Sequence, residues 1–140
     1  MAPHPDTAQY LALFLEECSE QIAILEREAI ALEQDPSPER VQAMFRAAHT
    51  VKGSSRAMGF LNLATLTHEM ENVLDLMRAG ELAFTPDTAD VMLRCLDTLK
   101  LMRDSVTAGL GDAVGTEEVL AALHGCMYGG ASIRRSETAL

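Results

Sequence analysis

Apolar residues recur at helical spacing along nearly the whole chain, and this periodicity is what most restricts the fold. The clearest stretch lies in the first quarter, where steps of three and four residues connect Leu11, Leu15, Cys18, Ile22, Leu25, Ala29 and Leu32. Such steps place the side chains on one face of an α-helix. No segment shows the strict alternation of a half-buried β-strand. We therefore expect an all-α protein.

Prolines and glycines divide this pattern into separate helices. Residues 35–38, Asp-Pro-Ser-Pro, end the first helix and offer a serine cap and a first-turn proline to a second. We expect the second helix to weaken near Gly59. A third should run from about residue 62 to residue 79, where Gly80 ends it. The pair Thr85-Pro86 then begins a fourth helix.

The remaining segment predicts a small fifth helix and completes the architecture. Thr116 can cap this helix, and Glu117 and Glu118 are favourable in its first turn. Seven-residue repeats on the long helices and short connections between them favour antiparallel packing of sequential helices. We predict an antiparallel up-down-up-down four-helix bundle with a short fifth C-terminal helix. Residues 1–128 form this domain, and residues 129–140 are a flexible tail or the start of a linker.

Composition narrows the class of protein. A length of 140 residues suits one domain, and a net charge of −10 disfavours nucleic acid and anionic lipid as partners. No apolar run approaches the roughly 18 residues of a membrane span, and the first residues lack a signal peptide, so we expect a cytoplasmic location. Cys18, Cys95 and Cys126 include no close pair, so they are interpreted as small buried hydrophobic residues.

His49 lies beside the core-facing stripe of the second helix. Its own stripe carries only polar or very small residues, namely Gln42, Arg46, Lys52, Gly53 and Arg56. The imidazole should be at least partly exposed, and the flanking cations would neutralise an anion placed on it. Glycine inside a helix costs about 1 kcal/mol relative to alanine, a cost that close approach by a partner would explain. From these residues alone, a surface histidine in a basic patch explains the pattern equally well.

A second polar feature lies on the third helix. His68 and Glu71 are three residues apart and share a face beside the core stripe. If the second and third helices pack antiparallel, this face can flank His49. A carboxylate that accepts the Nδ1–H of His49 would fix the tautomer and leave Nε2 as the nucleophile. Taken alone, a His/Glu pair at this spacing is ordinary on a helix surface.

Two motifs resemble one known family. Residues 47–55, Ala-Ala-His-Thr-Val-Lys-Gly-Ser-Ser, resemble the phosphoacceptor motif of histidine phosphotransfer domains, in which His-x-x-Lys-Gly precedes small residues. Residues 67–75, Thr-His-Glu-Met-Glu-Asn-Val-Leu-Asp, are similar to the third helix of one branch, the N-terminal phosphoacceptor domain of CheA-type chemotaxis histidine kinases. The resemblance covers roughly residues 14–106.

The resemblance implies roles for five residues. His49 corresponds to the phosphoacceptor, and Lys52 corresponds to the lysine that neutralises the phosphate. Gly53 corresponds to the glycine that lets a partner approach the helix backbone closely. Glu71 corresponds to the acidic residue that hydrogen-bonds the acceptor imidazole, with His68 in the same network. Arg56 departs from the small residues common at its position.

The resemblance also implies partners. The sequence has no glycine-rich nucleotide loop and no paired metal carboxylates, so we expect this domain to bind no cofactor or metal and not to be a complete kinase. The phosphoryl group would come from ATP on a CheA-type kinase domain, in the same chain or another, and pass to an aspartate of a CheY-like response regulator. The response regulator should cover the second helix at Gln42, Arg46, Lys52 and Arg56.

Three other interpretations remain open. A phosphorelay shuttle outside chemotaxis would share the chemistry and differ in its partners. A metal-binding bundle could use His49, His68 and Glu71, although the His-x-x-Glu order is the reverse of the di-iron pattern, and Lys52 and Arg56 would repel a cation. A helical interaction module could bind a partner helix through its methionines, most of which fall on core stripes.

Overall fold

The computed structural model describes residues 5–129, and this part of the chain forms helices without any strand. The elements are α1 (Pro5–Gln34), α2 (Pro38–Met58), α3 (Leu61–Arg78), α4 (Pro86–Thr107), α5 (Glu117–His124) and a terminal π-helix (Gly125–Gly129). The all-α prediction is confirmed. The helix starts after Ser37 and Thr85 are where they were predicted, and α3 begins and ends one residue earlier than expected. The predicted tail at residues 129–140 lies almost entirely outside the described residues.

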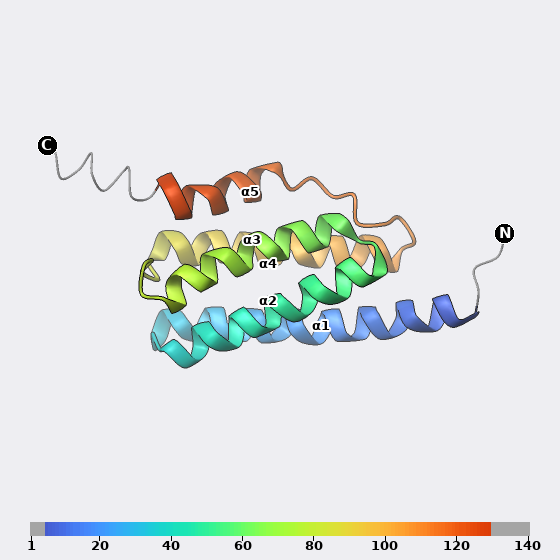
Figure 1. Ribbon diagram of the computed structural model, residues 1–140, viewed down its shortest axis with the longest axis horizontal. Coiled ribbons are helices and arrows are strands. Elements are labelled where there is room, and N and C mark those ends of the chain that lie inside the picture. Colours follow the sequence, from blue (N-terminus) through green and yellow to red (C-terminus); the bar gives the residue numbers. More distant parts are fainter. Residues whose placement is uncertain (1–4, 130–140) are drawn as a thin grey trace, which may run out of the picture.

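The four long helices lie side by side and alternate in direction (Figure 1). Contacts join α1 with α2 and α4, and α3 with α2 and α4, as an up-down-up-down bundle requires. The short helix α5 packs against α3 and α4, away from α1 and α2. Helix α5 therefore does not pack against α2.

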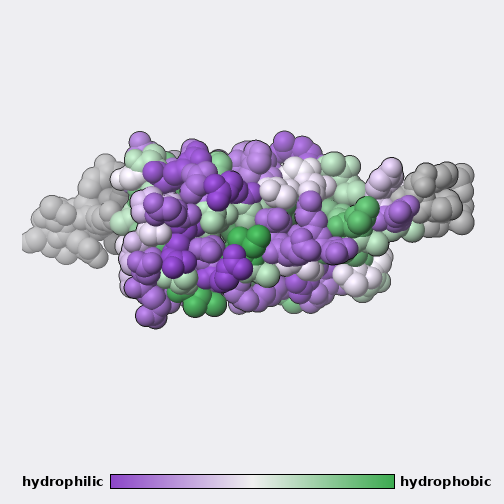
Figure 2. Space-filling model, turned by 90° about the horizontal axis from the view of Figure 1, so that it is seen from below, coloured by the Kyte–Doolittle hydropathy of each residue, from purple (hydrophilic) through white to green (hydrophobic). Residues whose placement is uncertain are grey.

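The core fills the centre of the bundle with side chains from all four long helices. The largest fully buried side chains are Ile22, Leu25, Leu32, Met44, Leu63, Leu66, Met70, Leu74, Met92, Leu96, Leu99 and Met102. Polar side chains cover most of the face drawn in Figure 2, and its hydrophobic patches are small and separate. None of the helices within residues 5–129 is long and apolar enough to cross a membrane.

The predicted apolar stripe of α1 is fully buried from Cys18 onward, and in its first two turns it packs against the core but omits Phe14. Leu11 and Leu15 are only half-buried, and the buried residue there is Phe14, whose ring packs 5.3 Å from that of Phe60. Phe14 thus contacts the α2–α3 connection at this end of α1. A stripe drawn from spacing alone does not include this contact.

The cysteines are free thiols. Cys18 and Cys95 are buried, as predicted, and Cys126 is half-buried. Burial raises the pKa of Cys18 to about 11 and that of Cys95 to about 12. Both thiols therefore remain protonated and pack as small apolar side chains.

Local capping explains most of the helix boundaries. Ser37 accepts a hydrogen bond from the backbone N–H of Arg40 at 3.3 Å, and Gly59 ends α2 with φ of 82°. Thr116 precedes α5 as predicted, but its side chain accepts no bond from that helix. Its backbone, with φ of −120° and ψ of −1°, lies outside the extended region from which a capping side chain reaches the first turn.

The N-terminus of α3 is capped from a distant loop. Phe60 occupies the cap position and has no side-chain acceptor to offer. Instead, a carboxylate oxygen of Asp112, in the α4–α5 loop, accepts the backbone N–H of Leu63 at 2.9 Å. This contact fastens the loop to the start of the helix that carries Glu71.

Candidate functional site

His49 lies in the middle of α2, on the side next to α3. Its helix neighbours Ala48 and Val51 are fully buried and hold α2 against the core, whereas the His49 side chain is 62% exposed. The imidazole is thus fixed at its base by a rigid helix and open to solvent at its outer edge, as the sequence predicted.

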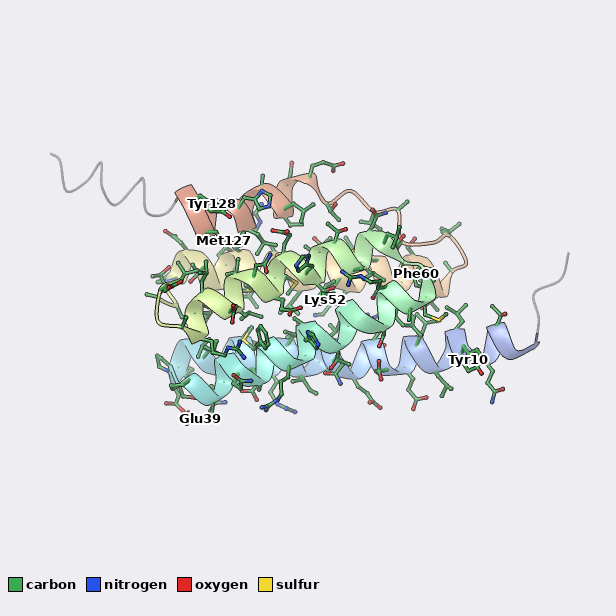
Figure 3. The ribbon with its side chains drawn as sticks, viewed as in Figure 1. Tyr10, Glu39, Lys52, Phe60, Met127 and Tyr128 are labelled. Atoms are coloured by element: carbon green, nitrogen blue, oxygen red, sulfur yellow. The ribbon has the colours of Figure 1, made fainter. Side chains whose placement is uncertain are left out.

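Glu71 of α3 connects His49 to Lys52. Its Oε1 lies 3.1 Å from Nδ1 of His49, and its Oε2 lies 2.8 Å from Nζ of Lys52. The Glu71 and Lys52 side chains are only 12% and 15% exposed. Figure 3 shows Lys52 on the side of α2 that faces α3. The antiparallel packing of α2 and α3 therefore brings together three of the predicted residues.

The electrostatics of this cluster favour an ionised carboxylate. Burial by itself would raise the pKa of Glu71, but hydrogen bonds and charge from Lys52 and His49 outweigh it, so the pKa lies below its usual value. An ionised carboxylate can only accept hydrogen bonds, so Nδ1 of His49 carries the proton in this contact. In the neutral imidazole, Nε2 then holds the lone pair and is the nucleophilic nitrogen.

His68 does not join this cluster. Its side chain is exposed, and no hydrogen bond or ion pair connects it with another of the described residues. The next residue, Glu69, instead accepts a hydrogen bond from Nε2 of His124 in α5 at 3.0 Å. Whether both His68 and Glu71 reach α2 depends on how the two helices cross, because residues three apart on a helix still differ by about 60° in direction.

The predicted contact residues on α2 differ in what they present to a partner. Arg46 and Arg56 are exposed. Gln42 is half-buried and accepts a hydrogen bond from Arg78, and the charge of Lys52 is directed at Glu71. Gly53 is exposed, and a Cβ atom built there would meet no atom within 4 Å. Nothing in the described part of the chain therefore requires glycine at position 53.

Two residues that the sequence analysis did not single out are Phe45, beside the imidazole, and Arg78, which contacts Phe45. A hollow of about 330 Å³ next to His49 is lined by Phe45, Arg46, Thr50 and Glu71 as well. The Phe45 ring lies alongside the imidazole, and the guanidinium of Arg78 lies over the Phe45 ring. Phe45 was recognisable as an aromatic residue one turn before His49. Arg78, from the end of α3, could be found only from the tertiary structure.

Metal ligation has no support in this cluster. Within residues 5–129, no group of three or more His, Cys, Asp or Glu side chains is arranged to hold a metal ion. The Lys52 ammonium already contacts Oε2 of Glu71. A metal cation bound to this oxygen would therefore lie against a positive charge.

Comparison with known proteins places this geometry in a family. The Hpt domain model matches residues 9–106. Chemotaxis protein CheA of Bacillus subtilis is 42% identical over 105 residues, which are 74% of this chain and 16% of that protein. CheA of Listeria monocytogenes is 38% identical over 123 residues, which are 87% of this chain and 20% of that protein. The chain thus spans no more than a fifth of these relatives.

Solved structures agree with the family match. The solution structure of the histidine phosphotransfer domain of CheA has a TM-score of 0.77 and 30% identity, covering 84% of this chain and 90% of that one. The phosphorylated P1 domain of CheA3 from R. sphaeroides, in complex with CheY6, has a TM-score of 0.77 and 25% identity, covering 83% and 93%. This chain belongs to the Hpt domain family. Within that family it is similar to the CheA phosphotransfer domain, which confirms the resemblance found in the sequence.

Proposed function

We propose that this chain is the phosphoacceptor and phosphodonor domain of a CheA-type chemotaxis kinase, and that His49 is its acceptor. The observation that carries the proposal is the cluster on α2 and α3, in which an exposed imidazole is held at Nδ1 by the carboxylate of Glu71. The cluster lies in a chain that matches the Hpt domain model and CheA proteins. A cytoplasmic location, where ATP and response regulators are found, is part of the proposal.

The first transfer begins with attack by the lone pair of His49 Nε2 on the γ-phosphorus of ATP bound to a kinase domain. The bond between that phosphorus and the bridging oxygen breaks, and ADP leaves. The ring becomes positively charged while Nδ1 keeps its proton. The ionised carboxylate of Glu71, 3.1 Å from Nδ1, stabilises this positive charge as it develops.

The second transfer reverses the change at the imidazole. A carboxylate oxygen of an aspartate on a CheY-like response regulator attacks the phosphorus, and the N–P bond breaks. Its electron pair returns to Nε2, so His49 is again a neutral imidazole. The domain contributes a positioned nucleophile, while the partners supply most of the charge neutralisation for the phosphoryl group.

Lys52 and Gly53 have supporting roles in this proposal. Lys52 contacts the outer oxygen of Glu71 at 2.8 Å and keeps that carboxylate ionised and in place. Its ammonium also adds a positive charge near the phosphorylated imidazole. Gly53 leaves open surface one turn after His49, where the active site of a partner must approach α2.

The choice of chemotaxis over another phosphorelay rests on the relatives. The curated relatives reported above are chemotaxis proteins CheA, and one structural relative was solved as a complex with CheY6. A transfer panel with several receiver domains tests this choice, because a chemotaxis domain should phosphorylate a CheY-like receiver fastest. Faster phosphoryl transfer to a receiver unrelated to CheY would instead favour a phosphorelay shuttle outside chemotaxis.

The central experiment is labelling by a CheA-type kinase domain with radiolabelled ATP. The wild-type protein should take up phosphate that acid removes and base does not, as expected of a phosphoramidate. His49→Gln should abolish labelling and retain the helical circular dichroism spectrum, since the side chain lies outside the core. His68→Gln is the matched control, because His68 is also exposed and lies on the adjacent helix. Label retained by His49→Gln would overturn the assignment.

The partner surface can be tested separately. Arg46→Glu and Arg56→Glu should weaken binding of the receiver domain, because these exposed arginines are on α2 on either side of His49. Arg94→Glu, at an exposed site on α4, is the control and should bind as the wild type does. Receiver-induced NMR shifts that cluster on α4 and spare residues 42–56 would contradict the proposed orientation.

A further inference from the structure

The His49 imidazole is held by Glu71 at only one atom. The hydrogen bond at Nδ1 fixes the tautomer and opposes rotation about the Cβ–Cγ bond, but it is a single contact on a side chain that is 62% exposed. In-line attack requires Nε2 to point at the phosphorus, so the orientation of the ring matters as much as its protonation. A second contact on the ring would restrict its rotation further.

Phe45 provides a flat surface beside the imidazole. It lies one turn before His49 on α2, and the two rings are nearly parallel, with an interplanar angle of 13° and centroids 6.3 Å apart. The Phe45 side chain is half-buried and packs against the core, so its own orientation is restricted. An offset parallel arrangement of this kind is a favourable geometry for aromatic rings.

Phe45 is in turn held by Arg78 from the last turn of α3. The Arg78 guanidinium lies over the Phe45 ring, 3.9 Å from its centroid, in a cation–π contact. It also donates hydrogen bonds to a carboxylate oxygen of Asp75 at 2.6 Å and to the side-chain oxygen of Gln42 at 3.3 Å. A continuous series of contacts therefore runs from the end of α3 through Phe45 to the imidazole.

We propose that Phe45 and Arg78 are positioning residues for His49. Glu71 sets the tautomer and stabilises the charged ring, whereas the Arg78–Phe45 stack restricts rotation of the ring so that Nε2 is presented in one direction. This inference rests on the proposed function of His49 as phosphoacceptor. Neither residue has to touch the phosphoryl group for this role.

The kinetic test compares Phe45→Leu with Phe45→Tyr. Leucine keeps an apolar side chain but removes the flat ring, and we expect the labelling rate at saturating kinase to fall roughly threefold to tenfold. The kinase concentration for half-maximal rate should not change, because binding is not altered. Tyrosine keeps the ring and should retain the rate. Phe84→Leu, at a half-buried phenylalanine within the α3–α4 connection, is the control and should leave the rate unchanged.

An NMR measurement without kinase separates this inference from the proposed function. Phe45→Leu should leave the imidazole ¹⁵N shifts unchanged, because Glu71 still fixes the tautomer. It should lower the ¹³C order parameter of the His49 ring, and Arg78→Gln should lower it less. A wild-type order parameter in both variants would overturn the positioning role even if labelling confirmed His49. Failure of wild-type labelling would overturn the proposed function while the NMR result stood.

The test remains valid even if one variant is too unstable to fold. Arg78 is on the surface, so Arg78→Gln should remain folded even if Phe45→Leu does not. A variant with the wild-type circular dichroism spectrum, reduced ring order and a reduced labelling rate supports the proposal. Reduced ring order at the wild-type labelling rate would contradict it.

Discussion

Replacing Lys52 with methionine would keep most of the length of this side chain and remove the ammonium that contacts Glu71. In the wild type, the Nζ–Oε2 distance is 2.8 Å, and the two side chains are 15% and 12% exposed. Exposed ion pairs contribute about 0–1 kcal/mol. Leaving a mostly buried acceptor without its partner costs about 1–3 kcal/mol. Because this pair is mostly buried, we expect Lys52→Met to lower the free energy of unfolding by about 1–3 kcal/mol near pH 7.

Lys100→Met is the matched control, since Lys100 is the other lysine of the chain. It pairs with Glu26 between α4 and α1, where the side chains are 34% and 40% exposed. The same substitution should there cost only about 0–1 kcal/mol. Urea unfolding followed by circular dichroism gives both values under identical conditions.

The pH dependence supplies a second criterion. The folded pKa of Glu71 lies below its usual value of 4.5, so the carboxylate stabilises the fold above about that pH and loses this effect as pH falls through the folded pKa. In Lys52→Met, burial remains while the main cause that lowers the pKa is gone, so the pKa of Glu71 should rise. The stability difference between wild type and Lys52→Met should therefore shrink below about pH 4.5. An unchanged difference at acid pH, or a loss near pH 7 no larger than that of Lys100→Met, would refute the reasoning.

Three further predictions concern the scaffold. Asp112→Ala should lower the free energy of unfolding by about 1 kcal/mol in urea, because α3 loses its N-terminal cap, whereas Asp97→Ala on the exposed face of α4 should have little effect. Gly53→Ala should raise the melting temperature, since alanine favours a helix by up to about 1 kcal/mol and its Cβ would meet no atom within 4 Å. The same substitution should slow labelling by the kinase, because the partner approaches α2 at position 53 in the proposed function. Ser55→Ala should not destabilise the fold, because the buried Ser55 hydroxyl has no hydrogen-bond partner among the described residues. A clear loss of stability in Ser55→Ala would show that this hydroxyl has a partner.

Local features of the sequence were sufficient for much of this protein. Helix boundaries after Ser37 and Thr85 followed from caps and prolines, whose effects act within one turn. The exposed position of His49 followed from its offset of one residue from buried Ala48, because one residue turns the side chain by about 100° around the helix. The likeness to CheA phosphotransfer domains also followed from short stretches of neighbouring residues.

Contacts between helices could not be predicted in this way. They depend on the rotation of each helix about its axis and on the angles at which the helices cross in the packed core. Sequence reasoning anticipated that Glu71 could meet His49, and the resemblance placed His68 in the same network. Core packing placed Glu71 against His49 and Lys52, and left His68 at the surface. It also brought Asp112 to the start of α3, 49 residues away from Leu63 in sequence. Such contacts are set by the side chains that fill the space between helices, and no local pattern encodes them.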